Sequence, residues 1–299
     1  MDRLHLMNVF VAVAEEESFA AGARRLAMSP PAVTRAIAEL EKNLGVKLLS
    51  RTTRYVRATD AGLRYLESAR RILTDADEAD EMAAGIHGTP RGQLAVTAPV
   101  LVGRMFVMPS IVEYLGTHPD VSVSALFLDR IVNLIEEGLD VGVRIGELPD
   151  STLHAITVGH VRRVVCASPE YLKGKKKLKS PQELAQHTII AANPVSPGAD
   201  WRFGTGKKSI DVKITPCLTT SNNDAAIQAA LQGFGVTRLM SYQVAGHLKA
   251  GTLKRLLVEF EPAPLPIHVL HREGRQASAK VRTFVDLLVE QLRGDAALK

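Results

Sequence analysis

Apolar residues recur at helical spacing near the start of the chain and predict two short helices. Leu6, Phe10 and Val13 form one face of the first helix, and three consecutive glutamates at positions 15–17 end it. Ser18 follows where a helix N-cap is expected, because its hydroxyl can accept a hydrogen bond from a free backbone N–H of the next turn. The second helix is therefore predicted to begin at Phe19.

A turn at Met28 and Ser29 leads into a third predicted helix. Ser29 followed by Pro30 is a strong helix start, because proline lacks the N–H that has no partner at the first helical position. Gly45 is expected to end the helix in the left-handed conformation. The apolar face carries Val33, Ile37, Leu40 and Leu44, and the opposite face carries Pro31, Arg35, Ala38 and Lys42. Such a face suits a DNA major groove, although any small helical bundle also has a polar outer face.

The segment 46–57 alternates like a short hairpin, with Arg51, Thr52, Thr53 and Arg54 at its tip. Arginines at a hairpin tip can enter a narrow minor groove or pair with phosphate. Positive charge is concentrated here, because residues 18–57 contain eight Lys and Arg against two Glu, a net charge of +6 in a chain of net charge +5. This distribution favours one DNA-binding module followed by a part with a different role.

A long helix is predicted after Thr59, which can act as its N-cap, because no proline occurs between Thr59 and His87. A narrow coiled-coil seam is indicated by alternating spacings of three and four between Gly62, Tyr65, Ala69, Ile72, Ala76, Ala79, Ala83 and Ile86. The helix is too long for a sixty-residue domain to cover, so it is expected to pair with a second copy. The alternative is a helix that lies against its own C-terminal domain. Glycines and a proline at 85–92 predict a hinge.

From Gln93 onward, short apolar strands alternate with helices. The predicted elements of the first set are strands at 94–98, 121–128 and 141–145, with helices at 104–117 and 131–137. The second set has strands at 164–167, 188–191, 210–215 and near 236, with a helix at 224–232. A last strand at 267–270 and helix at 277–292 would complete the first set. This order predicts parallel, doubly wound sheets in two lobes, a chain that crosses twice between them, and a ligand between the lobes.

Composition limits the alternatives. The 299 residues, 46% hydrophobic and 23% charged, suggest about two globular domains. Cys166 and Cys217 have no metal-type spacing, and no uninterrupted apolar stretch approaches the ~18 residues of a membrane span, so an intracellular protein is expected. No nucleophile motif or metal-type histidine spacing indicates an enzyme. The competing classes are a metabolite-binding enzyme with an unusual N-terminal bundle and a nucleoid protein that binds DNA without an effector.

Several segments closely resemble LysR-type transcriptional regulators. In the first part these are 27–35, Leu40-Glu41, 44–48, Arg51-Thr52 and 59–62, and in the second part 139–146, 167–172 and 233–236. The resemblance implies an α/β protein overall: an all-α winged helix-turn-helix (1–59), a linker and dimerisation helix (60–88), and a two-lobed α/β effector domain (89–299) resembling periplasmic binding proteins. The first lobe is expected at about 89–162 and 267–299, and the second at about 163–266.

The resemblance, taken with the helix and hairpin pattern, implies two sets of binding residues. The expected DNA contacts are Ser18, Ser29, Pro30, Pro31, Thr34, Arg35, Arg51, Thr52, Thr53 and Arg54. The expected effector contacts are Thr97, Ala98, Pro99, Val100, Phe127, Arg144, Ile145, Trp201 and Asn222. Arg144 suits either an effector carboxylate or a structural salt bridge, and Trp201 either an aromatic effector or the core.

Two departures from the family pattern affect base preference rather than fold. Pro30 stands where many members carry glutamine, and Leu49-Ser50 replaces the usual Phe-Glu. The expected function is a cytoplasmic, nucleoid-associated regulator, not an enzyme, that binds double-stranded promoter DNA as a homodimer or homotetramer. Its expected partners are a small-molecule effector and RNA polymerase. No other cofactor and no membrane are expected to bind.

Overall fold

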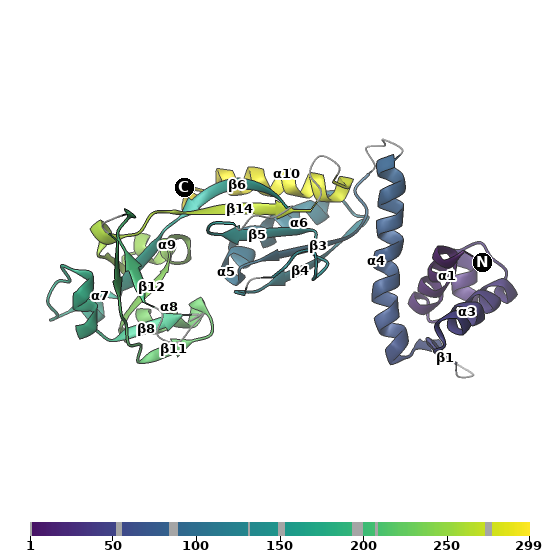
Figure 1. Cartoon of the computed structure of the whole chain (residues 1–299), viewed down its shortest axis with the longest axis horizontal. Coiled ribbons are helices and arrows are strands. Elements are labelled where there is room, and N and C mark those ends of the chain that lie inside the picture. The colour runs from purple at the N-terminus through teal and green to yellow at the C-terminus, as the bar shows by residue number, and fades with distance from the viewer. Residues whose placement is uncertain are drawn as a thin grey trace. The chain divides into compact units, whose positions relative to one another are not determined.

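Helices make up most of the first 83 residues, and two mixed β-sheets with covering helices make up most of the rest (Figure 1). The computed structural model describes residues 2–51, 56–83, 89–130, 132–148, 153–192, 200–206, 209–272 and 277–299. The chain divides into two compact units, Met1–Gln93 and Leu94–Lys299.

The first unit is a small helical domain with a two-stranded hairpin. Its elements are α1 (Arg3–Glu15), α2 (Phe19–Arg25), α3 (Pro30–Leu44), β1 (Leu49–Arg51), β2 (Val56–Ala58) and α4 (Asp60–Ala83). The predicted apolar faces form its core, because Phe10 and Val13 of α1 are buried with Val33 and Ile37 of α3. Residues 84–88 of the expected linker lie outside the described residues.

Local signals set the helix ends much as predicted. Ser18 caps α2, its hydroxyl accepting a hydrogen bond from Ala21 N at 3.3 Å. Gly45 ends α3 in the left-handed region, with φ of 69°. The expected cap at Ser29 is wrong in one respect, since its side chain makes no capping hydrogen bond and Pro30 alone marks the start of α3. Thr59 caps α4, its Oγ1 accepting from Gly62 N at 3.0 Å.

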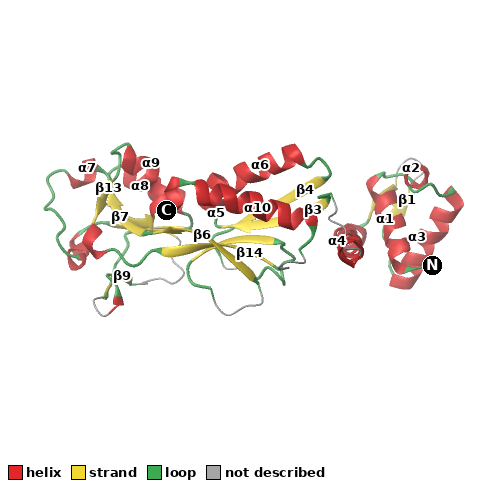
Figure 2. Cartoon of the chain, turned by 90° about the horizontal axis from the view of Figure 1, so that it is seen from above, coloured by secondary structure: helices red, strands yellow, loops and turns green. Residues whose placement is uncertain are grey.

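The first lobe of the second unit is built on a five-stranded sheet with strand order β4-β3-β5-β14-β6. The strands are β3 (Gly92–Ala98), β4 (Val121–Phe127), β5 (Val141–Ile145), β6 (His154–Val161) and β14 (Leu265–His271). The helices are α5 (Val100–Val102), the π-helical turn η1 (Gly103–Val107), α6 (Met108–Thr117) and α10 (Ala279–Gly294), with the 3-10 turn η5 (Ala296–Leu298). Figure 2 shows α6 and α10 side by side over the sheet, where Tyr114 and Phe284 meet edge to face at 5.2 Å.

The second lobe has a five-stranded sheet with strand order β11-β8-β12-β7-β13 and a separate hairpin of β9 and β10. The strands are β7 (Arg163–Ala167), β8 (Ile189–Ala192), β9 (Trp201–Phe203), β10 (Ile210–Val212), β11 (Leu218–Thr220), β12 (Val236–Met240) and β13 (Lys254–Leu256). The helical elements are α7 (Pro169–Leu172), α8 (Asn223–Leu231), α9 (Ser241–Lys249), and the 3-10 turns η2 (Pro181–Gln186) and η4 (Val258–Phe260).

The predicted parallel sheets are wrong in part, because both sheets are mixed. β3 pairs with β5 in parallel, as β8 does with β11 and β12. However, β14 is antiparallel to both β5 and β6, and β7 is antiparallel to β12 and β13. The antiparallel strands are those next to the two crossings, where the chain enters and leaves the second lobe. The last strand and helix do complete the first lobe, as expected.

One other local prediction differs from the structure. The helix expected at 131–137 is absent from the described part of that segment, residues 132–137, which forms turns and loop. Val132 and Leu134 of this segment are nevertheless buried, so their apolar spacing reflects packing onto the sheet. By length and composition alone, the helical run Val100–Thr117 is long and apolar enough to span a membrane. One side of the run belongs to the core of the first lobe, because Leu101, Val107 and Tyr114 are buried there.

Candidate functional site

The solvent face of α3 carries the small and basic residues that the sequence predicts. Pro31, Arg35, Ala38 and Lys42 are all exposed, and Thr34 beside them is partly exposed. Arg35 forms no ion pair or hydrogen bond with another described residue, so its guanidinium is available to a ligand. Ser29 and Pro30 are exposed at the N-terminus of the helix. The small side chains on this face would allow the backbone of α3 to lie close to the floor of a DNA groove.

The hairpin next to α3 is anchored by a buried carboxylate. Glu41 of α3 is 7% exposed and accepts hydrogen bonds from Leu48 N at 3.0 Å, Leu49 N at 3.2 Å and Lys47 Nζ at 2.6 Å. Burial raises the pKa of this carboxyl, but the hydrogen bonds from Lys47, Leu49 and Leu48 outweigh it, so the pKa lies below its usual value. The sequence analysis missed this role, although an acidic residue next to the apolar positions of α3 was its signal.

The hairpin is held from its other side by the start of α4. Thr59 donates from Oγ1 to Lys47 O at 2.8 Å and from its backbone N to Leu48 O at 2.9 Å. A Cβ at Gly62 would lie 2.0 Å from Leu48 O, so only glycine allows this approach. The antiparallel pairing of β1 and β2, with Arg51 opposite Val56, forms the predicted hairpin. Its expected tip residues Thr52, Thr53 and Arg54, and the side chain of Arg51, lie outside the described residues.

The seam predicted on α4 is divided between two environments. Its first part faces the unit's own core, since Ala69 is fully buried and Tyr65 packs edge to face on Phe10 at 5.5 Å. Farther along, Ile72 is 39% exposed, and Leu63 on another face is 54% exposed. Glu15 of α1 ties the helices together, because its carboxylate binds Arg25 of α2 and Arg70 of α4, each at 2.6 Å.

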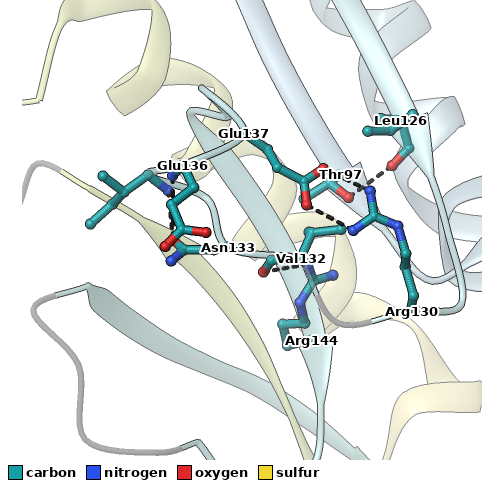
Figure 3. Close-up of polar contacts among 9 residues, drawn as sticks. Thr97, Leu126, Arg130, Val132, Asn133, Glu136, Glu137 and Arg144 are labelled. Atoms are coloured by element: carbon teal, nitrogen blue, oxygen red, sulfur yellow. Dashed lines mark hydrogen bonds and ion pairs between the residues drawn. The ribbon is translucent and has the colours of Figure 1, made fainter. Parts of the chain in front are cut away.

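The effector positions expected after β3 differ in accessibility. Thr97 and Ala98 are fully buried, and Thr97 Oγ1 donates to Leu126 O at 2.8 Å (Figure 3). Pro99 and Val100, at the start of α5, are partly exposed, and Val100 N donates to Asp129 Oδ1 at 3.0 Å. The ring of Phe127 fills the space beside Gly103, where a Cβ would lie 2.4 Å from it. Of this group, Pro99 and Val100 are the residues best placed to meet a ligand.

Arg144 lies on β5, partly buried, with Ile145 after it. It donates from Nη1 to Val143 O at 3.2 Å and from Nη2 to Val132 O at 3.4 Å, as Figure 3 shows for Val132. Burial lowers the pKa of Arg144, and the charge of Glu137 opposes this. Glu137 itself binds Arg130 through two hydrogen bonds at 2.8 and 2.9 Å, so no carboxylate among the described residues pairs directly with Arg144.

The two expected effector residues of the second lobe have structural partners. Trp201 of β9 is 6% exposed, and the guanidinium of Arg238 lies 4.8 Å from its ring centroid. This placement matches the core role that the sequence left open. Asn222 caps α8, its Oδ1 accepting from Ala225 N at 2.8 Å. Near this cap, Asp224 of α8 binds Arg104 of the first lobe at 3.0 Å, a contact between the lobes that sequence analysis missed.

Comparison with protein families covers both units. A model of the LysR substrate binding domain matches residues 87–293, and a model of the bacterial regulatory helix-turn-helix protein, lysR family, matches residues 4–63. The chain belongs to the LysR family. It is therefore a DNA-binding transcriptional regulator whose binding is modulated through its effector domain, as the sequence predicted.

Similar LysR proteins match along nearly the whole chain. The regulator CrgA of Neisseria meningitidis is 32% identical in sequence over 96% of this chain and 96% of its own length. The solved structure of CrgA superposes on this chain with a TM-score of 0.62, and the superposition covers 97% of this chain and 99% of CrgA. An HTH-type transcriptional repressor of Pseudomonas aeruginosa is 31% identical over 97% of this chain and 92% of its length. The full-length structure of the Vibrio cholerae virulence activator AphB, 23% identical, has a TM-score of 0.62 over 97% of this chain and 99% of that one. These likenesses confirm the expected fold.

Proposed function

We propose that this LysR regulator binds promoter DNA by inserting α3 into the major groove and the β1–β2 hairpin into the adjacent minor groove. The exposed small and basic face of α3 is the observation that carries the proposal. Pro31 and Ala38 let the helix approach the bases, and Thr34 and Arg35 reach base edges or phosphates. Ser29 and Pro30 lie at the helix N-terminus, which attracts phosphate.

The remaining DNA contacts are proposed at the edges of this surface. Ser18 uses its hydroxyl oxygen to cap α2, which leaves its O–H free to donate to a phosphate oxygen. Arg51, Thr52, Thr53 and Arg54 are proposed for the minor groove and its phosphates. Glu41 and Thr59 support this assignment, because they fix the base of the hairpin to α3 and α4.

We further propose that the protein acts in the cytoplasm on nucleoid DNA as a homodimer or homotetramer, with a regulatory and not a catalytic role. The length of α4, 24 residues or about 36 Å, and the exposed Leu63 and Ile72 support pairing of this helix with a second copy. Two copies would present two α3 helices to a two-fold-symmetric site. A regulator bound at a promoter lies where RNA polymerase binds, which makes the polymerase the proposed partner for activation.

The proposed effector is a small molecule that binds between the lobes. Pro99 and Val100 are partly exposed beside the carboxyl end of β3, and Arg144 and Ile145 end the parallel neighbour β5. Ligands of open α/β sheets bind at such strand ends. Thr97, Ala98 and Phe127 would shape the site from behind, and Asn222 and Trp201 would shape it from the second lobe. The effector can change DNA binding only if its affinity differs between two conformations of the protein.

Selection of bound genomic fragments by the full-length protein, with and without a panel of metabolites, tests this function. We expect a recurrent, two-fold-symmetric sequence to be enriched and one class of metabolite to change its recovery. Recovery of random fragments with no common sequence would contradict specific recognition, whereas a common sequence that no metabolite affects would contradict effector control alone.

A further inference from the structure

Two arginines of the second lobe lie side by side on one face of its sheet. Arg163 is the first residue of β7, and Arg238 lies in the neighbouring strand β12. The antiparallel register pairs Arg163 with Met240 and Arg238 with Val165. Arg163 and Arg238 are therefore diagonal neighbours whose side chains leave the sheet on the same face.

Apolar residues lie next to the arginines on that face. Val165 and Val236, which share it with the arginines, are buried in a cluster with Trp201 and Phe203. Burial lowers the pKa of Arg163. The pKa of Arg238 is lowered to about 10, mainly by burial and in addition by the positive charge of Arg163. No carboxylate among the described residues forms an ion pair with either arginine or acts on either pKa. The two positive charges thus lie together, partly desolvated, with no counter-charge among the residues that the structure describes.

Arg238 is held in a fixed orientation. Its guanidinium lies over the ring of Trp201 at 4.8 Å, and its Nη1 donates to Arg202 O at 3.3 Å. Trp201 and Arg202 belong to the hairpin of β9 and β10, whose acidic residue is Asp211. Asp211 binds the exposed side chain of Arg202 through hydrogen bonds of 2.9 and 3.2 Å. Asp211 is therefore engaged elsewhere, and Trp201 serves to position a guanidinium whose other N–H groups can still donate.

The pair lies where ligands of such folds bind. β12 and β8 are parallel, and Arg163 is paired with Met240 at the carboxyl end of β12. The residue before Arg163, Arg162, is where the chain enters the second lobe, and its backbone exchanges hydrogen bonds with Ser241 at 2.7 and 3.1 Å. An anion bound here would contact β7, the strand through which the chain enters the second lobe.

We propose that Arg163 and Arg238 form an oxyanion-binding site for the carboxylate of a small molecule. The guanidinium fork matches a carboxylate in two parallel N–H to O hydrogen bonds, and two adjacent guanidiniums supply charge that no described carboxylate compensates. The site lies outside the set of positions that family resemblance supplies, and it does not depend on the proposed DNA contacts. Inorganic phosphate shares the same oxyanion chemistry, so the experiment compares the two.

The test uses thermal unfolding and calorimetric titration of the full chain with succinate and with inorganic phosphate, at constant ionic strength set by sodium chloride. Wild type is expected to bind succinate and to unfold at a higher temperature in its presence. Arg163→Gln should weaken that affinity by about tenfold or more, through loss of a charge-assisted pair of hydrogen bonds. Arg162→Gln, which removes the same charge from the exposed neighbouring side chain, should leave the affinity unchanged.

A second readout separates a binding role from a structural one. Without any added anion, Arg163→Gln is expected to raise the unfolding temperature, because it removes one of two adjacent like charges. A lower unfolding temperature together with an unchanged succinate response would overturn the proposal. Binding of phosphate but not of succinate would overturn the assignment to a carboxylate. Operator binding is measured in parallel, and its absence in every variant would contradict the proposed function while leaving the anion site intact.

Discussion

The carboxylate of Glu41 accepts a hydrogen bond from the backbone N–H of Leu48 at 3.0 Å, so the helix proposed to enter the major groove is joined directly to the hairpin proposed for the minor groove. Leu48 is also bound through its carbonyl to Thr59 at the start of α4. One backbone segment thus links the recognition helix, the wing and the long helix. The spacing of the proposed DNA contacts would depend on this junction.

Replacement of Glu41 by glutamine should weaken the junction. The amide keeps one acceptor oxygen but loses the charge that binds Lys47 and two backbone N–H groups, so we expect the free energy of unfolding of the first unit to fall by about 1–3 kcal/mol. Thermal unfolding followed by circular dichroism measures the change. Glu67→Gln, on the exposed surface of α4, is the control and should be neutral. Equal stability of the two variants would contradict an anchoring role for Glu41.

Acid should destabilise the first unit through the same group. The hydrogen bonds of Glu41 hold its folded-state pKa below the unfolded value, as those from Arg25 and Arg70 do for Glu15 despite burial. The stability from each carboxylate is therefore complete above the unfolded pKa, about 4.3, and is lost as the pH falls through the lower folded-state pKa. Wild type should lose stability below about pH 4.5 more steeply than Glu41→Gln. Parallel pH profiles would contradict this linkage.

The sequence was sufficient for most helix ends and buried faces of the first unit, because these signals are local. Ser18 and Gly45 set helix ends by their own hydrogen bonding and backbone conformation, and apolar spacing within each helix identified the buried faces. The seam on α4 shows the limit of such a pattern. Spacings of three and four identify an apolar stripe but not its partner, and Ala69 packs on the unit's own core.

The second unit depended on pairing between distant segments. Alternating strands and helices predicted parallel sheets, yet β14 returns from the end of the chain and inserts antiparallel between β5 and β6. Similarly, Arg163 and Arg238 become neighbours only through the register of β7 and β12. The buried environment of Trp201 also depends on such a contact, because Arg238 covers its ring.

The contact between Arg104 and Asp224 predicts a small coupling between the lobes. Both side chains are largely exposed, so a double-mutant cycle of Arg104→Ala and Asp224→Ala should give a coupling energy of about 0.2–1 kcal/mol that falls as salt is added. Thermal unfolding of the full chain at two salt concentrations provides the measurement. A coupling that is zero at low salt would show that the lobes do not use this contact in solution.

Arg51 is predicted to contact phosphate. Arg51→Ala should lower DNA affinity for all sequences by a similar factor and reduce the slope of log K against log salt by about 1, because one fewer counterion is released. Fluorescence anisotropy with operator and random duplexes over a range of salt measures both effects. Lys249→Ala, at the end of α9 in the second lobe, removes the same charge away from the proposed surface. An unaltered slope would remove Arg51 from the phosphate contacts.

Arg35 is predicted to recognise bases, because its side chain is exposed on the face of α3 that is proposed to enter the groove and makes no ion pair with a described residue. Arg35→Ala should leave the unfolding temperature unchanged, since an exposed side chain contributes little to stability. Operator affinity should fall roughly tenfold to a hundredfold, the equivalent of about 1–3 kcal/mol, while affinity for random duplexes changes less. A gel-shift titration with both duplexes measures the ratio. An equal loss on both would reduce Arg35 to a phosphate contact, and an unchanged operator affinity would exclude it from the interface.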